Sequence, residues 1–199
     1  MKIRTVALAR AMSMVVVALN TNPAAAFSWW GFRAIYGVGD WGNSPQYYWI
    51  DSSASGQTSR VNTGMSQWVN TTSCVGVGNP VVYYNTSVKS KSRMDFYQES
   101  TVQSSYCAVT EFYIDTTRIV PRGYAPDRNW WWSKIIVARP ALFDSSSCPN
   151  RQGIIAHEMG HGFGLAHNTY SSTLMYSGIA GTSVTRAQLD DVNGVRYIY

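Results

Sequence analysis

Two kinds of hydrophobic pattern alternate along the chain. Short stretches rich in β-branched and aromatic residues predict strands at residues 47–51, 81–84, 93–98, 106–115 and 131–138. Longer stretches, in which apolar residues recur every three or four positions, predict helices at residues 58–69, 152–164 and 185–199. Strands that alternate with helices and end in a helix-rich segment indicate an α/β or α+β domain with a largely parallel sheet.

The segments between these elements have no clear period. Residues 27–45 combine glycines with aromatic residues, and we expect them to form an extended N-terminal segment that lies on the domain. Residues 116–129 contain several Pro and Gly residues, which predict a loop. Thr185 and Gln188 have the spacing of a capping box, so the last helix is expected to begin at Thr185.

The beginning of the chain has the three parts of a secretory signal peptide. Lys2, Arg4 and Arg10 precede a short apolar run, and residues 24–26 are alanines suited to cleavage. The alternative is a membrane anchor, but this run is far shorter than the roughly 20 residues that span a bilayer, and no later stretch is long enough. We therefore expect a secreted protein with a signal peptide at residues 1–26 and a single mature domain at residues 27–199.

Charge and cysteine content narrow the class of protein. The chain has 16 Lys and Arg residues against 11 Asp and Glu, and three of the basic residues lie in the leader, which leaves 13 against 11. This balance argues against a nucleic-acid partner. Three cysteines in an exported chain permit one disulfide and leave one thiol, with three reduced thiols as the alternative. None of them forms a CxxC pair, so a cysteine-based zinc site has little support.

All three histidines of the chain lie in one short sequence, HEMGHGFGLAH, which begins at residue 157. On a helix, His157 and His161 stack on the same face, close enough to hold one zinc ion. Gly164 can end the helix in a left-handed conformation, which would let His167 swing back as a third ligand. Three protein ligands leave a fourth position for water, which is the catalytic arrangement of zinc.

Glu158 gives this sequence its predicted chemistry. Its carboxylate can reach a metal-bound water and accept the proton as general base, and then deliver it to the leaving amine. The alternative is a set of ordinary helix histidines, but that explains neither Glu158 nor Gly164, and such a pattern should arise by chance on the order of once in 10⁵ chains. Gly160 and Gly162 each cost a helix interior about 1 kcal/mol, which we expect metal binding to offset.

The pattern HExxHxxGxxH is the metzincin signature, and this chain resembles that group of zinc proteases at every fixed position. Leu174-Met175-Tyr176 resembles the methionine turn of one metzincin family, the matrixins, and residues 189–199 are similar to the matrixin closing helix. The resemblance is specific over residues 153–199 and only topological before them. It implies a zinc endopeptidase with a five-stranded, mostly parallel sheet, an antiparallel edge strand, three helices and a small C-terminal subdomain.

The same resemblance implies roles for further residues. Residues 106–113 would be the edge strand that binds an extended peptide substrate. Met175 would form a packing floor beneath the metal rather than act as a ligand, although a lone methionine is otherwise core filler. Metzincins that use a tyrosine ligand have it two positions after the methionine, where this chain has a serine. The residues expected to line the S1′ pocket are Tyr176, Ser177, Gly178 and Ile179, from the segment that continues to residue 183.

The implied topology also suggests a disulfide and an ion pair. Cys107 would open the edge strand near the loop that carries Cys148, so we favour a Cys107–Cys148 bond with Cys74 unpaired. In matrixins the ammonium of a mature N-terminal aromatic residue pairs with the first aspartate of the closing helix, so Phe27 and Asp190 are candidates here, with an unpaired terminus as the alternative.

This chain departs from the matrixin pattern in several ways. It has no further histidines for a second, structural zinc, and its Asp residues are too isolated to support structural calcium. Residues 121–127 resemble the latency motif but lack its cysteine, so we expect a loop there. A leader that ends near Ala26 leaves no room for a propeptide. We expect one catalytic zinc and a monomer.

Two other functions compete with the endopeptidase. One is a secreted zinc-holding or glycan-binding module without catalysis, because the tryptophans at 29–30 and 130–132 could stack on sugars, although packing is the simpler role. The intact Glu158 argues against it. The other is zinc-dependent hydrolysis of a non-peptide amide or ester, which the motif alone leaves open.

Overall fold

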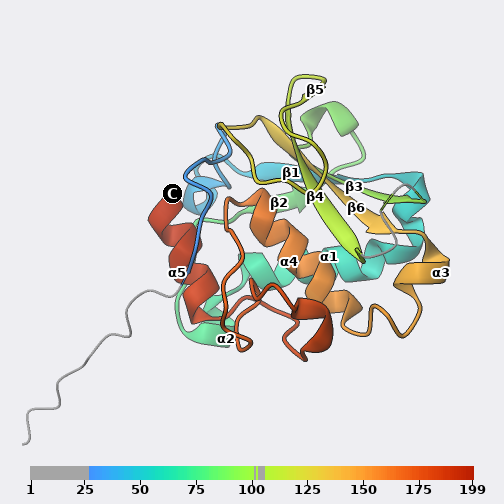
Figure 1. Cartoon of the computed structure of the whole chain (residues 1–199). Helices are drawn as coiled ribbons and strands as arrows, with labels where there is room; N and C mark the ends of the chain where they lie inside the picture. The colour runs from blue at the N-terminus through green and yellow to red at the C-terminus, as the bar shows by residue number, and fades with distance from the viewer. Residues whose placement is uncertain (1–26, 101, 103–105) are drawn as a thin grey trace, which may run out of the picture.

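A twisted six-stranded sheet crosses the molecule, and helices α1 and α4 lie against one of its faces (Figure 1). This computed structural model describes residues 27–100, 102 and 106–199. The strands follow the order β2-β1-β3-β6-β4-β5. Their bounds are Gln46–Ile50 (β1), Tyr83–Asn85 (β2), Met94–Glu99 (β3), Ala108–Ile114 (β4), Thr117–Arg118 (β5) and Trp132–Ala138 (β6). The predicted signal peptide lies outside the described residues.

The first four strands of this order are parallel, and β4 runs antiparallel to β6. The mostly parallel sheet with an antiparallel strand near its edge confirms the predicted fold class, and the five predicted strands are present to within two residues at each end. The sheet has six strands rather than five because β5 returns along β4 after a turn at Asp115, whose φ is 52°. Thr117 and Arg118 are exposed and polar, so no hydrophobic pattern predicted this strand.

The three predicted helices are the three long helices of the structure: α1 (Thr58–Val69), α4 (Arg151–Gly162) and α5 (Leu189–Ile198). Two short helices, α2 and α3, add single turns at Thr72–Val75 and Pro140–Phe143. Single 3₁₀ turns or pairs of turns occur at Asp40–Gly42, Ser52–Gln57, Lys89–Lys91 and Ile179–Gly181. Among the described residues no helix has both the length and the apolar character needed to cross a membrane.

The predicted start of the last helix at Thr185 is wrong. The N-cap of α5 is Gln188, which forms a capping box with Asp191 rather than with Thr185. The Asp191 carboxylate accepts a hydrogen bond from the Gln188 backbone N–H at 2.8 Å and also accepts from the backbone N–H groups of Leu174 and Met175, which lie far away in the chain. That long-range contact decides where the helix begins, and local spacing does not reveal it.

Helices α1 and α4 bury their apolar faces between themselves and the sheet. Val61, Met65 and Trp68, the predicted stripe of α1, are fully or almost fully buried. The Trp68 indole N–H donates to the backbone carbonyl of Ala156 in α4 at 2.8 Å, which satisfies the one polar atom of this large side chain. Because α1 and the sheet hold α4 from both sides, the residues on its remaining face are fixed in position.

The N-terminal segment is extended and lies on the domain, as predicted. Figure 1 shows it, in blue, beside α5 and the C-terminus. Trp29 forms a β-bridge with Leu165, and Ala34 forms one with Trp130. The backbone N–H of Ala34 also donates to the hydroxyl of the last residue, Tyr199, at 3.0 Å. The segment thereby links the end of the chain to the turn that follows α4.

One disulfide joins Cys107, at the start of β4, to Cys148 in the loop before α4, with 5.8 Å between the Cα atoms. This is the favoured pairing, and Cys74 is the free cysteine. The bond connects the edge strand to the segment that leads into α4, so it holds together two elements that border the same cleft.

Candidate metal centre and active-site cleft

Helix α4 carries both the predicted metal ligands and the predicted base, and Asn150 sets its start. The Asn150 side chain accepts a hydrogen bond from the Gly153 backbone N–H at 3.0 Å, which satisfies one of the free donors of the first turn. Its amide group donates to the backbone carbonyls of Val184 at 2.8 Å and Ile179 at 3.1 Å. One side chain thereby caps the helix and anchors the segment that follows the methionine turn.

The chain reverses direction after α4 at Gly164, whose φ is 100°. A residue with a side chain rarely adopts this conformation, so the glycine is needed for the turn. The Leu165 backbone N–H then donates to the carbonyl of Gly160 at 3.0 Å, which folds the turn back against the helix. The structure thus brings His167 to the same place as the two helix histidines, as predicted.

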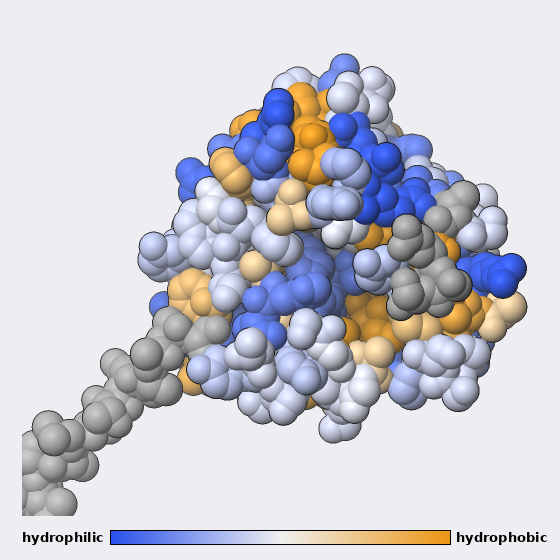
Figure 2. All heavy atoms as spheres, viewed as in Figure 1, coloured by the Kyte–Doolittle hydropathy of each residue, from blue (hydrophilic) through white to orange (hydrophobic). Residues whose placement is uncertain are grey.

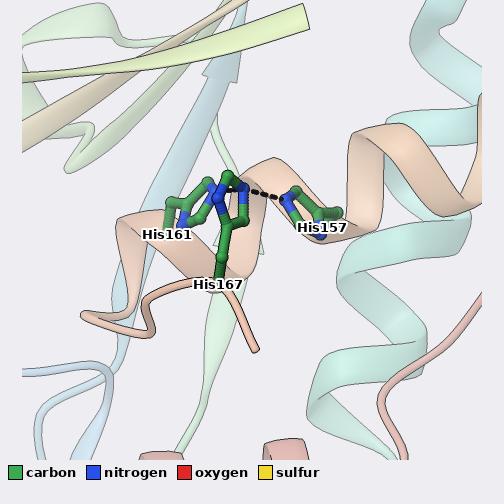
Figure 3. A group of neighbouring side chains, drawn as sticks. All are labelled: His157, His161 and His167. Carbon is green, nitrogen blue, oxygen red and sulfur yellow. Dashed lines mark hydrogen bonds between the residues drawn. The ribbon is translucent and has the colours of Figure 1, made fainter. Parts of the chain in front are cut away.

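The three imidazoles converge on one point (Figure 3). The Nε2 atom of His167 lies 3.1 Å from the Nε2 atoms of both His157 and His161. The Nδ1 atom of His157 lies 2.7 Å from the carbonyl oxygen of Leu174, and that of His161 lies 2.8 Å from the carbonyl oxygen of Leu165. A carbonyl only accepts, so both Nδ1 atoms carry the proton and both Nε2 atoms keep a lone pair.

Burial keeps these imidazoles neutral. It lowers the pKa of His157 to about 4 and the pKa of His161 well below its ordinary value. Partial desolvation also lowers the pKa of His167, which is the exposed member of the three. At neutral pH all three side chains therefore offer lone pairs, and three converging Nε2 atoms fit a zinc ion, which needs neutral imidazole.

Glu158 lies beside this centre and is buried. The Thr110 hydroxyl lies 2.7 Å from its Oε2 atom. Burial, which outweighs that hydrogen bond, raises the pKa of Glu158 to about 7. A carboxyl group that titrates near neutral pH can both take up and release a proton under the working conditions of an enzyme.

Met175 packs directly beneath α4. Its side chain is 2% exposed, and its sulfur atom occupies the place where a side chain on Gly160 would begin. Gly162 is similarly close to Ser133 of the sheet, since a Cβ atom added there would lie 2.9 Å from the Ser133 hydroxyl. These contacts supply a packing reason for both helix glycines, which the sequence interpretation had explained only by metal binding. Met175 thus lies against α4, and its role as a floor beneath the metal stays a prediction.

Asp191 ties the methionine turn to α5. Its two carboxylate oxygens accept hydrogen bonds from the backbone N–H groups of Leu174 at 2.8 Å and Met175 at 3.0 Å. The carbonyl of Leu174 in turn accepts the hydrogen bond of His157. Asp191 of the closing helix therefore supports the predicted ligand His157 through Leu174. From the sequence, a role was predicted for Asp190 but not for Asp191, which belongs to the same closing-helix motif. Its position three residues after an N-cap was the available indication.

A cleft of about 240 Å³ runs between α4 and β4. Its lining includes all three histidines, Glu158, Cys107 and the first residues of β4, from Ala108 to Thr110. Figure 2 shows the face drawn in Figure 1, with hydrophilic residues in the hollow at its centre and a hydrophobic patch beside them. Of the predicted pocket residues, Ser177 and Ile179 line the cleft, whereas Tyr176 and Gly178 lie outside its lining.

The opposite wall of the cleft is β4 and the loop that follows it. Because β5 pairs only with Tyr113 and Ile114, the part of β4 that lines the cleft lies at the edge of the sheet. The buried carboxylate of Glu111 accepts hydrogen bonds from Arg118 and Arg122, each at 2.6 Å. These ion pairs hold the loop that brings residues 123–125 to the cleft, a contribution that the sequence interpretation missed.

Three histidines and a buried glutamate below the edge strand of a mostly parallel sheet form the arrangement of a metalloprotease catalytic domain. Comparison with known proteins agrees with this class. A family model described as Matrixin matches residues 81–199, which is more than half of the chain. The chain therefore belongs to the matrixin family of peptidases.

Two curated relatives show similarity over a shorter stretch. Matrix metalloproteinase-18 of Xenopus laevis is 42% identical over 48 residues, which is 23% of this chain and 10% of that protein. Interstitial collagenase of Equus caballus is 40% identical over 50 residues, which is 25% of this chain and 11% of that protein. The match thus spans about a tenth of the length of these relatives.

Proposed function

We propose that this protein is a secreted zinc-dependent endopeptidase. The observation that carries the proposal is the convergence of three Nε2 atoms beside Glu158, in a cleft bordered by an edge strand. Family membership supports the peptidase class. The predicted leader at residues 1–26 supports export, and the disulfide agrees with an oxidising destination.

His157, His161 and His167 are the residues that would hold the zinc. Burial and bonds to backbone carbonyls keep the His157 and His161 imidazoles neutral and oriented, and the lowered pKa of His167 keeps its imidazole neutral as well, so the fit to zinc rests on three neutral nitrogen donors. When bound, zinc lowers the pKa of a water molecule and polarises the carbonyl of the scissile bond. Met175 supports the centre from beneath by packing against α4.

Glu158 is the proposed general base and acid. Its carboxylate accepts the proton of the attacking water and then protonates the leaving amine, so that cleavage of the amide bond leaves a carboxylic acid and an amine. The buried position favours this cycle because it brings the pKa of the side chain to about 7. The charged and neutral forms are then close in free energy at neutral pH.

The substrate is proposed to lie extended along β4. An edge strand offers unpaired backbone groups to a peptide, and this one passes directly over Glu158. Ile179 and Ile154 are buried apolar residues of the cleft lining. An apolar side chain of the substrate fits this end of the cleft, which agrees with a preference for a hydrophobic P1′ residue.

Incubation of the protein, without its leader, with casein and with a peptide library tests this function. The wild type and Glu158→Ala are compared with and without a chelator. Cleavage that the chelator and the substitution both abolish is expected. The absence of chelator-sensitive cleavage would contradict the protease function, leaving a zinc-holding module or hydrolysis of another amide or ester. Cleavage unchanged in Glu158→Ala would contradict the mechanism alone.

A further inference from the structure

One contact joins the two walls of the cleft at the proposed base. Thr110 lies in β4, opposite Ile135 of β6, and its hydroxyl faces two oxygen atoms of Glu158 in α4. The distances are 2.7 Å to the side-chain Oε2 atom and 2.9 Å to the backbone carbonyl oxygen. Thr110 is 5% exposed and Glu158 is 8% exposed, so little water reaches this contact.

The geometry of this contact limits what the hydroxyl can do. Thr110 carries one hydroxyl proton and faces two acceptors that belong to the same residue, so the hydrogen bond stays on Glu158 whichever acceptor receives it. A bond to the charged carboxylate is the stronger of the two. It occupies Oε2 and leaves Oε1 to take a proton from water.

A free glutamate side chain would not hold this position by itself. It rotates about several bonds, and fixing it in one orientation costs conformational entropy. A base that must reach one proton loses catalytic power when it is displaced by even about 1 Å. A buried hydrogen bond from a rigid strand is a direct way to restrict the carboxylate to one orientation.

We propose that Thr110 is the positioning residue of the general base, and that its hydroxyl orients the Glu158 carboxylate relative to the substrate bound along β4. The proposal rests on the proposed peptidase function. Because the same strand is the proposed binding site of the peptide, one hydrogen bond fixes the base relative to the substrate as well as to the helix. The sequence interpretation placed residues 106–113 at the substrate and assigned Thr110 no role.

A purely structural role for Thr110 makes different predictions. If the side chain only packs between β4 and α4, a valine of nearly the same shape should replace it without kinetic consequence. If it only places the substrate strand, its loss should raise KM and leave kcat unchanged. Orientation of the base instead predicts a loss in kcat with KM almost constant.

Steady-state kinetics of zinc-loaded Thr110→Val, Thr110→Ser and Ile135→Val test the proposal on one peptide substrate. Thr110→Val is expected to lower kcat by about 10- to 100-fold and to change KM less than about two-fold. Thr110→Ser keeps the hydroxyl and is expected to stay within about three-fold of the wild type. Ile135→Val removes a methyl group opposite Thr110 without touching the hydrogen bond, and its kcat should change less than about two-fold.

Three further measurements do not depend on turnover. Zinc content and melting temperature should be the same in Thr110→Val as in Ile135→Val, which shows that the loss is not one of metal or fold. The crystal structure of Thr110→Val should show the Glu158 side chain displaced or in more than one orientation. If Thr110→Val does not fold, Thr110→Ala is measured in its place, with the same expectations.

The proposal is overturned if Thr110→Val keeps the wild-type kcat, if only KM changes, or if Thr110→Ser loses as much kcat as Thr110→Val. An unchanged Glu158 side chain in the variant crystal would overturn it as well. Failure of the peptidase function gives a different result, because the zinc-loaded wild type would then cleave no peptide. An active wild type with an equally active Thr110→Val contradicts only the role of Thr110.

Discussion

The two walls of the cleft are built differently. The α4 wall is held by buried contacts with no spare room: Met175 fills the space beside Gly160, and Asp191 binds the turn that supports His157. The β4 wall has two parts: the strand itself, which β6 and the Cys107–Cys148 disulfide hold in place, and the loop after it, which is held by ion pairs of the partly exposed Arg118 and Arg122. The chemistry is thus placed on rigid elements, and the loop of the β4 wall is the part of the cleft that can adapt.

The largest effect should come from the base on the rigid wall. Glu158→Gln keeps the shape of the side chain but cannot accept a proton, so kcat should fall by about 10³-fold. Zinc content should stay at the wild-type level because Glu158 is not one of the three converging ligands. Peptide turnover and metal analysis check this together. A variant with more than about a tenth of the wild-type kcat would contradict the role of Glu158.

Packing beneath the metal centre should show the next largest effect. Gly160→Ala places a methyl group where the Met175 sulfur lies, and such overpacking costs about 1 to 3 kcal/mol. The free energy of unfolding, measured by denaturant titration, should fall by this amount. Gly56→Ala is the matched control, because nothing lies within 4 Å of the added atom. Equal stability of the two variants would show that the α4 wall is not tightly packed.

In the metal-free protein, the free energy of unfolding should depend on pH in opposite ways through Glu158 and through the buried histidines. Burial lowers the pKa of His157 to about 4, so this group stabilises the fold fully above its ordinary pKa and loses that contribution as the pH falls. Burial raises the pKa of Glu158 to about 7, so its contribution is present at acid pH and is lost as the pH rises. The two trends oppose each other.

When the carboxyl group is removed, only the contribution of the histidines to the pH dependence of stability should therefore remain. Between about pH 4.5 and 7, the unfolding free energy of metal-free Glu158→Gln should rise more steeply with pH than that of the wild type. Chemical denaturation across this range measures the difference. Parallel curves for the two proteins would contradict the burial of the carboxyl group.

The smallest effect should come from the ion pairs of the β4 wall. Arg122→Gln removes one of the two arginine ion pairs of Glu111 together with the Arg122–Glu99 pair and should loosen the loop at residues 123–125, so KM should rise about two- to five-fold with kcat unchanged. Arg128→Gln is the control, because the Arg128–Asp127 ion pair lies at the exposed surface of the same loop. A loss of kcat in Arg122→Gln would mean that this wall takes part in the chemistry.

The same comparison explains how much of the structure could be predicted from the sequence. The strands and long helices followed from hydrophobic patterns, and the histidines followed from spacing along one helix and one turn. These are local properties. The Cys107–Cys148 pairing came from the implied topology rather than from spacing, and the structure confirms it.

The features that sequence reasoning missed depend on long-range contacts. Thr110 and Glu158 are 48 residues apart, and Asp191 lies 17 residues from Leu174. Strand β5 has only two polar residues and forms because β4 is available for pairing. Two of the four expected pocket residues lie outside the cleft lining, because the direction of each side chain in a turn depends on the packing around it.

The central claim is that three imidazoles hold one zinc that Glu158 uses to cleave peptides. The most direct test removes all metal with a chelator, returns zinc in steps, and measures the turnover of one peptide at each step. We predict that turnover vanishes without metal and is fully restored at one zinc per chain, with no restoration in Glu158→Gln. Turnover that survives complete removal of the metal would contradict the account.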